Sequence, residues 1–213
     1  MALYKTIKCK EGALLGVWKI DETPEDLLSL YPDDQELQQL YVTKINAQRL
    51  LEKMAVRVLL HTLLPDPPVS IHYEPTGKPI LNGGELNVSI SHTKGFVAVI
   101  IAPFRHSVGV DIEPISDRVV KVAARFMGDK EYESLMHNSD KSVATICWSA
   151  KEALYKILGK PVVDFRNSMC LSSFPVADSG EISVEIFTET KQTFLLDYVI
   201  FDSIVLVWAE YVR

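Results

Sequence analysis

Three carboxylates and one lysine are the residues of this chain whose types and spacing best indicate chemistry. Two of the carboxylates, Asp111 and Glu113, alternate with apolar residues in the stretch 108–113. The pattern predicts a strand in which both acids face one side, roughly 7 Å apart along the backbone. Gly109 shares that side, and we expect it to leave room for a ligand to approach the backbone. Magnesium prefers such hard oxygen ligands, together with phosphate oxygens and water. The alternative is an acidic strand face exposed to solvent.

The third carboxylate and the lysine lie on a predicted helix. Glu152 and Lys156 are one turn apart, and Trp148 is one turn earlier on the same side. The tryptophan indicates that this side is covered, as it would be in a cleft between two lobes. The alternative is a surface ion pair worth only about 0.2–0.5 kcal/mol. Taken with the strand, the helix provides groups that could hold a divalent metal and a polyphosphate.

Weaker signals lie in the first half of the chain. Ser91 and His92 follow a predicted strand and could offer a hydroxyl and an imidazole to a phosphate. As a nucleophile pair they are unpersuasive, because adjacent residues on an extended chain point apart; the alternative is an ordinary loop histidine. Lys78 lies in a predicted Gly-Lys-Pro turn. A basic stripe recurs at helical spacing in Arg49, Lys53 and Arg57, and its alternative interpretation is a solvated helix face.

The composition limits the classes of function. The 213 residues carry a net charge of -6, which argues against a general nucleic-acid binder. No window has the length of a membrane-spanning helix. The three cysteines are far apart and form no C-x-x-C pair, so neither a disulfide framework nor a zinc site is indicated. We expect a cytoplasmic protein that binds neither membrane nor nucleic acid.

The hydrophobic pattern predicts an α+β fold built from two similar lobes. Each half reads as a strand, then helices, then antiparallel strands, with the join near 103–106. We therefore expect an N-terminal lobe over 1–103 and a C-terminal lobe over 104–213. Each lobe is expected to be an antiparallel sheet packed on a long helix, and the active site is expected in the cleft between the two lobes. The predicted long helices cover 35–64 and 143–158. Thr23 is predicted to cap a short helix that begins at Pro24.

The ordered set of motifs resembles the 4′-phosphopantetheinyl transferases, and more closely their surfactin-synthetase-activating type, a pseudodimer of two α+β lobes. The motifs that carry the resemblance are Gly77-Lys78-Pro79, Asn87 to His92, Gly109 to Glu113 and Trp148 to Lys156. This family transfers the phosphopantetheine arm of coenzyme A to a serine of an apo acyl or peptidyl carrier protein. The resemblance therefore implies a cytoplasmic transferase with coenzyme A as co-substrate and adenosine 3′,5′-bisphosphate as the leaving product.

The resemblance also implies roles for individual residues. Magnesium, with manganese as the alternative, would be bound against the coenzyme A pyrophosphate by Asp111, Glu113 and Glu152. Lys156 would stabilise charge on the transferring phosphoryl group, and Glu152 or a metal-bound water would take the serine proton. The residues implied on the coenzyme A side are Arg49, Lys78, Ser91, His92 and Lys151. Phosphoryl transfer needs positioning and electrostatic stabilisation more than a protein nucleophile.

Carrier proteins are acidic, so their docking surface should be basic with an apolar centre. The segment after the metal strand fits this description with Val119, Lys121, Val122, Arg125 and Met127; the alternative is an ordinary amphipathic helix. We expect the chain to act as a monomer.

One stretch departs from the family pattern. Before the basic helix, where relatives carry Lys or Arg, this chain has the acidic stretch 33–36. Two other functions stay open: a non-catalytic binder of coenzyme A or of a carrier protein with the same fold, and a metal-dependent nucleotide hydrolase.

Overall fold

The computed structural model describes residues 3–65, 70–136, 140–158, 164–187 and 190–212. The chain is α+β and divides into two compact units. The first unit comprises Met1–Val108 with Tyr211–Arg213, and the second comprises Gly109–Glu210. Among the described residues, every helix is too short or too polar to cross a membrane.

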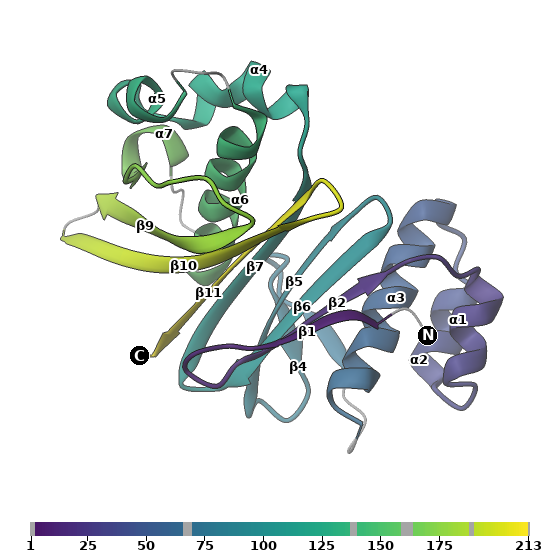
Figure 1. Cartoon of the computed structure of the whole chain (residues 1–213). Coiled ribbons are helices and arrows are strands. Elements are labelled where there is room, and N and C mark those ends of the chain that lie inside the picture. Colours follow the sequence, from purple (N-terminus) through teal and green to yellow (C-terminus); the bar gives the residue numbers. More distant parts are fainter. Residues whose placement is uncertain (1–2, 66–69, 137–139, 159–163, 188–189, 213) are drawn as a thin grey trace. The chain divides into compact units, whose positions relative to one another are not determined.

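The first unit contains a four-stranded antiparallel sheet with the strand order β1-β2-β6-β5 (Figure 1). Its strands are β1 (Leu3–Lys8), β2 (Leu14–Lys19), β5 (Leu86–Thr93) and β6 (Phe96–Pro103). The helix α3 (Ala47–Leu63) packs on β2 and β6. Gly16 makes this packing close, because a Cβ there would lie 2.9 Å from the side-chain ends of Leu59 and Leu63.

The predicted long helix over 35–64 is wrong as a single element. The structure has α2 (Gln35–Tyr41) and then α3, with a break over 42–46. Val42, Thr43 and Ile45 are β-branched and disfavour helix. The Asn46 side chain accepts hydrogen bonds from the backbone of Gln48 and Arg49 and so starts a new helix.

Two smaller elements complete the first unit. The helix α1 (Pro24–Leu30) has the predicted Thr23 cap, which forms a capping box with Asp26. A hairpin joins β3 (Ile71–Tyr73) to β4 (Pro79–Leu81) through the predicted turn, in which Gly77 has φ of +87°. The hydrophobic pattern of the sequence does not predict strands at β1 (Leu3–Lys8) or β4.

The second unit contains a five-stranded sheet with the order β7-β11-β10-β9-β8. The strands are β7 (His106–Pro114), β8 (Met169–Leu171), β9 (Ser179–Phe187), β10 (Lys191–Phe201) and β11 (Ile204–Val212). The helices are α4 (Asp117–Phe126), α5 (Asp129–Leu135), α6 (Lys141–Leu158) and the short α7 (Phe165–Ser168).

The core of the second unit forms between α6 and the sheet (Figure 1). Ile146, Ala150 and Ala153 on α6 are buried with apolar side chains of β9, β10 and β11. This is the inward stripe expected for a helix with apolar residues at a spacing of three and four. The opposite side of α6 is therefore left for polar groups. In the sequence, Gly159 followed by Pro161 also predicts the end of this helix, but both positions lie outside the described residues.

Candidate functional site

Asp111 and Glu113 lie on the same side of β7, as the alternation predicts. Asp111 is buried with a side-chain exposure of 6%, whereas Glu113 is half-buried. Val110 and Ile112 are fully buried. The apolar residues thus hold the strand in place, and the two carboxylates share one side of it.

Helix α6 brings the lysine to this strand. Lys156 Nζ donates a hydrogen bond to the Asp111 carboxylate at 3.0 Å and another to the Val110 carbonyl at 2.7 Å. Glu152 lies one turn before Lys156 and is half-buried. The strand motif and the helix motif therefore form one cluster, although Asp111 and Lys156 are 45 residues apart along the chain. We name Asp111, Glu113, Glu152 and Lys156 the carboxylate cluster.

Gly109 has a different partner from the one that the sequence suggested. A Cβ at this position would lie 2.0 Å from the carbonyl oxygen of Ala153 and 2.9 Å from the Ile157 side chain. The backbone of α6, not a ligand, occupies the space that the missing side chain leaves. The glycine therefore allows β7 and α6 to approach closely enough for the carboxylate cluster to form.

The carboxylates of the cluster perturb one another electrostatically. Burial and the neighbouring Asp111 carboxylate raise the pKa of Glu113 from 4.5 to about 7, against a hydrogen bond from Trp148 and the charge of Lys156. Burial also raises the pKa of Glu152, and Asp111 raises it further while Lys156 opposes the change. Accumulated negative charge in a poorly solvated place favours a bound cation or a bound proton.

Trp148 is half-buried against aromatic rings of its own unit and also orients a carboxylate, while the covering of this side of α6 by a second lobe stays a prediction. Its indole N–H hydrogen-bonds to Glu113. Its ring makes edge contacts with Phe126, at 5.1 Å between centroids, and with Phe165, at 5.9 Å. Sequence reasoning missed Phe165, because its approach to α6 depends on tertiary structure and no spacing rule indicates it.

The carboxylate cluster has the ligand types of a magnesium site, but its carboxylate oxygens do not yet converge on one position. Three ionisable carboxylates supply the hard oxygen ligands that this ion prefers. As their side chains stand, no group of three His, Cys, Asp or Glu residues in the described part of the chain is arranged to hold an ion. The donor set fits the metal in kind, and its side chains would have to converge further.

Lys151 is not placed to contact a ligand. Its side chain is 0% exposed, and its ammonium group forms an ion pair of 2.6 Å with Glu131. It also donates to the backbone carbonyls of Phe126, Phe165 and Met169. The prediction of Lys151 as a coenzyme A ligand is therefore wrong. A lysine next to Glu152 on a helix points about 100° away from it, into the unit's interior.

The predicted carrier-docking residues separate into two groups. Lys121 and Arg125 are exposed on α4. Val119 and Val122 are half-buried and pack against the core of the second unit. Met127 is 0% exposed within that core and cannot form part of a docking surface, so this part of the prediction is wrong.

The first unit contains a cavity of about 630 Å³, which we name the nucleotide pocket. Its charged and aromatic lining comes from α2, α3, β3 and β5, and comprises Glu36, Arg49, Glu52, Lys53, Arg57, His72, Tyr73 and His92. Burial raises the pKa of Tyr73, and the nearby charge of Arg49 lowers it. A concave site with basic and aromatic groups is suited to a phosphorylated nucleoside.

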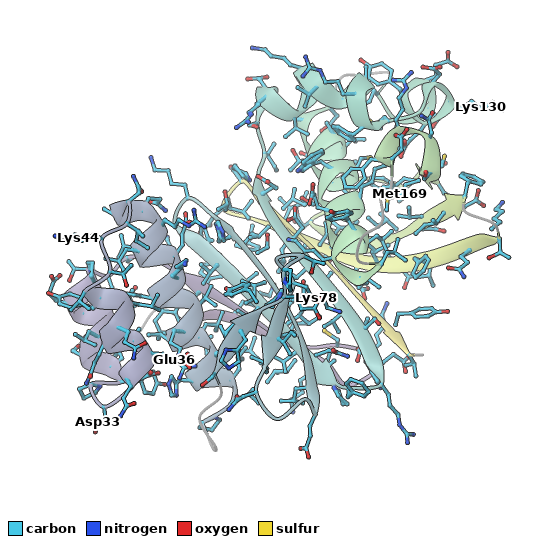
Figure 2. The ribbon with its side chains drawn as sticks, turned by 180° about the vertical axis from the view of Figure 1, so that it is seen from behind. Asp33, Glu36, Lys44, Lys78, Lys130 and Met169 are labelled. Atoms are coloured by element: carbon cyan, nitrogen blue, oxygen red, sulfur yellow. The ribbon has the colours of Figure 1, made fainter. Side chains whose placement is uncertain are left out.

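Four predicted coenzyme A residues belong to this first unit. Arg49 and His92 line the nucleotide pocket. Ser91 does not line it, because it is buried on the other face of β5 from His92. Lys78 is half-buried in the β3–β4 hairpin, one residue before the strand partner of Tyr73 (Figure 2). Sequence reasoning missed Glu52 and Tyr73, which had no distinctive spacing.

The comparison with protein families matches the second half of the chain. A family model described as the 4′-phosphopantetheinyl transferase superfamily matches residues 107–206. This range contains all four residues of the carboxylate cluster.

Individual proteins extend the match into the first half. The 4′-phosphopantetheinyl transferase gsp of Aneurinibacillus migulanus is 32% identical over 167 residues, which are 74% of this chain and 67% of that protein. The 4′-phosphopantetheinyl transferase psf-1 of Bacillus pumilus is 31% identical over 67% of this chain and 62% of its own length. A 4′-phosphopantetheinyl transferase of Bacillus subtilis is 27% identical over 61% of this chain and 58% of its own length. The match thus spans two thirds or less of the length of these relatives.

Proposed function

Because the chain belongs to the 4′-phosphopantetheinyl transferase superfamily, we propose that it transfers the phosphopantetheine arm of coenzyme A to a serine of an apo carrier protein. The observation that carries the proposal is the carboxylate cluster, in which β7 and α6 bring Asp111 within 3.0 Å of Lys156. Glu113 and Glu152 lie near enough for the Asp111 charge to raise the pKa of each.

Magnesium would be held by Asp111, Glu113 and Glu152. When bound, the ion supplies positive charge to the pyrophosphate of coenzyme A. Support comes from the raised pKa values of Glu113 and Glu152, for which burial is the larger cause and the charge of Asp111 the next, against the opposing charge of Lys156. Manganese is the alternative metal, since it accepts the same oxygen ligands.

The other steps belong to the protein's own groups. The serine oxygen attacks the phosphorus that carries pantetheine, and the bond from this phosphorus to the adenosine 5′-phosphate oxygen breaks. Glu152 takes the serine proton, a role supported by burial, which makes its carboxylate more basic than usual. Lys156 places its ammonium beside the transferring phosphoryl group and stabilises the charge that develops there.

The nucleotide end of coenzyme A would lie in the nucleotide pocket of the first unit. Its volume of about 630 Å³ is in the range of small-molecule sites. Arg49 and His92 would face the phosphates, and Tyr73 offers an aromatic ring for the base. We omit Lys151 and Ser91 from this set, because both are buried away from the pocket, and we retain Lys78, whose hairpin partner strand contributes Ile71, His72 and Tyr73 to the lining.

An acidic carrier protein would dock on the exposed basic side of α4. Lys121 and Arg125 supply the positive charge there, which favours encounter with an acidic partner. The half-buried Val119 and Val122 supply apolar surface beside them. The monomeric state stays a prediction. The cytoplasm is the proposed compartment, and the wide separation of the three cysteines along the sequence, without any C-x-x-C pair, supports it.

The experiment is a transfer assay with coenzyme A, magnesium and a panel of apo carrier proteins. We expect Asp111→Ala and Glu152→Ala to reduce transfer at least about 100-fold, as loss of a positioned base or charge does. Glu133→Ala removes an exposed carboxylate from α5 and serves as the matched control. Full activity in either site variant would overturn the assignment. Coenzyme A binding without transfer by the unmodified chain would support the non-catalytic alternative.

A further inference from the structure

The positive charges of the nucleotide pocket are largely compensated by carboxylates of the protein itself. Its lining includes the basic side chains of Arg49, Lys53 and Arg57, and the acidic side chains of Glu36 and Glu52. A pocket built to select a nucleotide by an additional phosphate should carry a clear excess of positive charge. The contacts of each group decide whether such an excess exists.

Arg57 is the most deeply placed of the three cations, and two acids already hold it. Its Nε donates to Asp34 at 2.7 Å, and its Nη1 lies 3.1 Å from Glu36. Only 5% of the residue is exposed. Burial alone would raise the pKa of Asp34, but hydrogen bonds from Arg57, the Leu37 backbone and His61 outweigh it and keep the carboxyl ionised. Arg57 therefore brings little uncompensated charge to a ligand.

The acids come from the stretch that departs from the family pattern. Asp34 also caps α2 by accepting from the backbone N–H groups of Glu36 and Leu37. Asp33 and Glu36 lie toward one end of the α2–α3 pair and Lys44 toward the other (Figure 2). Of the acidic stretch, Glu36 thus lines the pocket, and Asp34 holds the Arg57 side chain that also lines it.

A second carboxylate faces the other side of the pocket. Glu52 lies on α3 and is buried, and its Oε2 is 3.1 Å from His92 Nδ1. Gln48 donates to its other oxygen at 2.8 Å. A phosphate placed against His92 would therefore meet the Glu52 charge as well.

Two cations remain for a phosphate. Within the described part of the chain, Arg49 and Lys53 form no ion pair, and both are exposed on α3. Contacts between exposed charges in water are weak, with a typical value of about 0–1 kcal/mol per pair. Against them stand Glu36 and Glu52, which oppose a dianion in the same cavity.

From this balance we infer that the enzyme uses 3′-dephospho-coenzyme A nearly as well as coenzyme A. The inference rests on the proposed function and specifies the donor class of that site. In the reaction the serine oxygen bonds to the phosphorus that carries pantetheine, and Glu152 takes the proton. The bond to the adenosine 5′-phosphate breaks, so AMP leaves in place of adenosine 3′,5′-bisphosphate. No co-reactant beyond the carrier protein is needed.

The test compares kcat/KM for the two donors with one apo carrier protein. We expect the values to agree within about tenfold, which corresponds to about 1.4 kcal/mol. Glu36→Gln removes one opposing charge and keeps a hydrogen-bonding side chain on a partly exposed position. This variant should increase the preference for coenzyme A over the dephospho donor about 3- to 10-fold, mainly through a lower KM of coenzyme A. Glu133→Gln makes the same charge change on α5 and should leave the ratio unaltered.

The possible outcomes separate the two proposals. A preference for coenzyme A above about tenfold in the unmodified chain would overturn the inference and leave the transferase function intact. An unchanged ratio in Glu36→Gln would also overturn it, because the pocket charge would then play no part in donor choice. Absence of transfer from both donors would overturn the proposed function and this inference with it. Calorimetry with AMP and adenosine 3′,5′-bisphosphate gives an independent measure, in which Glu36→Gln should tighten binding of the bisphosphate more than that of AMP.

Discussion

Replacing Gly109 with alanine should separate the two halves of the carboxylate cluster. The new Cβ would lie 2.0 Å from the Ala153 carbonyl oxygen, whereas real Cβ contacts are essentially never under 3.0 Å. Strand β7 and helix α6 must therefore move apart by roughly 1 Å. The obstacle is a backbone carbonyl of a packed helix, so turning a side chain cannot relieve it.

The magnitude has two parts. Overpacking of a well-packed interior costs about 1–3 kcal/mol, and a contact with backbone places this variant toward the upper end. A displacement of about 1 Å between groups that act together can reduce a rate about 100-fold. Because Asp111 lies on β7 and its partner Lys156 lies on α6, we expect the loss of activity to exceed what the loss of stability explains.

Gly16→Ala is the matched control. It makes the same chemical change on a strand against the long helix of the first unit. Its Cβ would lie 2.9 Å from the ends of Leu59 and Leu63, which can turn away. We expect a smaller loss of stability and a transfer rate close to that of the unmodified chain.

The assay measures kcat/KM for transfer from coenzyme A at a temperature where circular dichroism shows each variant to be folded. Thermal unfolding of each variant provides the stability comparison. The role of this close approach would be refuted if Gly109→Ala is folded and its kcat/KM lies within about threefold of that of the unmodified chain. Such a ratio corresponds to a difference in activation free energy under about 0.7 kcal/mol.

Three further predictions concern metal binding, the interior of the second unit and carrier docking. The pKa of Glu113 is about 7 in the folded chain, above its ordinary value of 4.5, so protonation of this carboxyl stabilises the fold. This contribution to stability is complete below pH 4.5 and is lost as the pH rises through about 7. Without metal the melting temperature should therefore fall between about pH 5 and pH 8, and magnesium should restore more of it at the higher pH, because a metal ligand must be ionised. Lys151→Met leaves Glu131 buried without its partner and should cost about 3–5 kcal/mol in urea unfolding, while Lys151→Met combined with Glu131→Leu should recover part of this loss. Lys121→Glu with Arg125→Glu should raise the KM for an acidic carrier protein and leave the KM for coenzyme A unchanged.

Each of the three has a contradicting result. A melting temperature that magnesium does not affect at any pH would argue against the metal site. A loss under about 1 kcal/mol for Lys151→Met would show that water reaches the Glu131 carboxylate and that the pair is not desolvated. A rise in both KM values in the α4 variant would indicate a general structural effect and not docking.

Local patterns predicted the elements that carry the carboxylate cluster. Alternation places Asp111 and Glu113 on one side of β7, and the apolar stripe of α6 leaves Glu152 and Lys156 on its other side. These inferences succeed because strand and helix periods dictate which residues share a face. The α+β class follows from the same periodicities.

Two of the errors came from features that only packing determines, and a third came from local signals that were given too little weight. Lys151 looks like a surface lysine in the sequence, yet it pairs with Glu131, 20 residues away. Met127 lies one residue beyond α4, where the chain turns into the core. The break after Tyr41 depends on a short β-branched run and on the Asn46 cap. The continuous apolar pattern of the sequence outweighed these two signals in the prediction of a single helix over 35–64.

Transfer of phosphopantetheine by a Glu152→Gln variant tests the central claim most directly. The substitution keeps the size of the side chain and removes its ability to take a proton. The unmodified chain with magnesium and coenzyme A should increase the mass of an apo carrier protein by one phosphopantetheine group. Glu152→Gln should still bind coenzyme A in calorimetry but transfer at least about 100 times more slowly. Transfer by this variant at the rate of the unmodified chain would contradict a catalytic role for the carboxylate cluster.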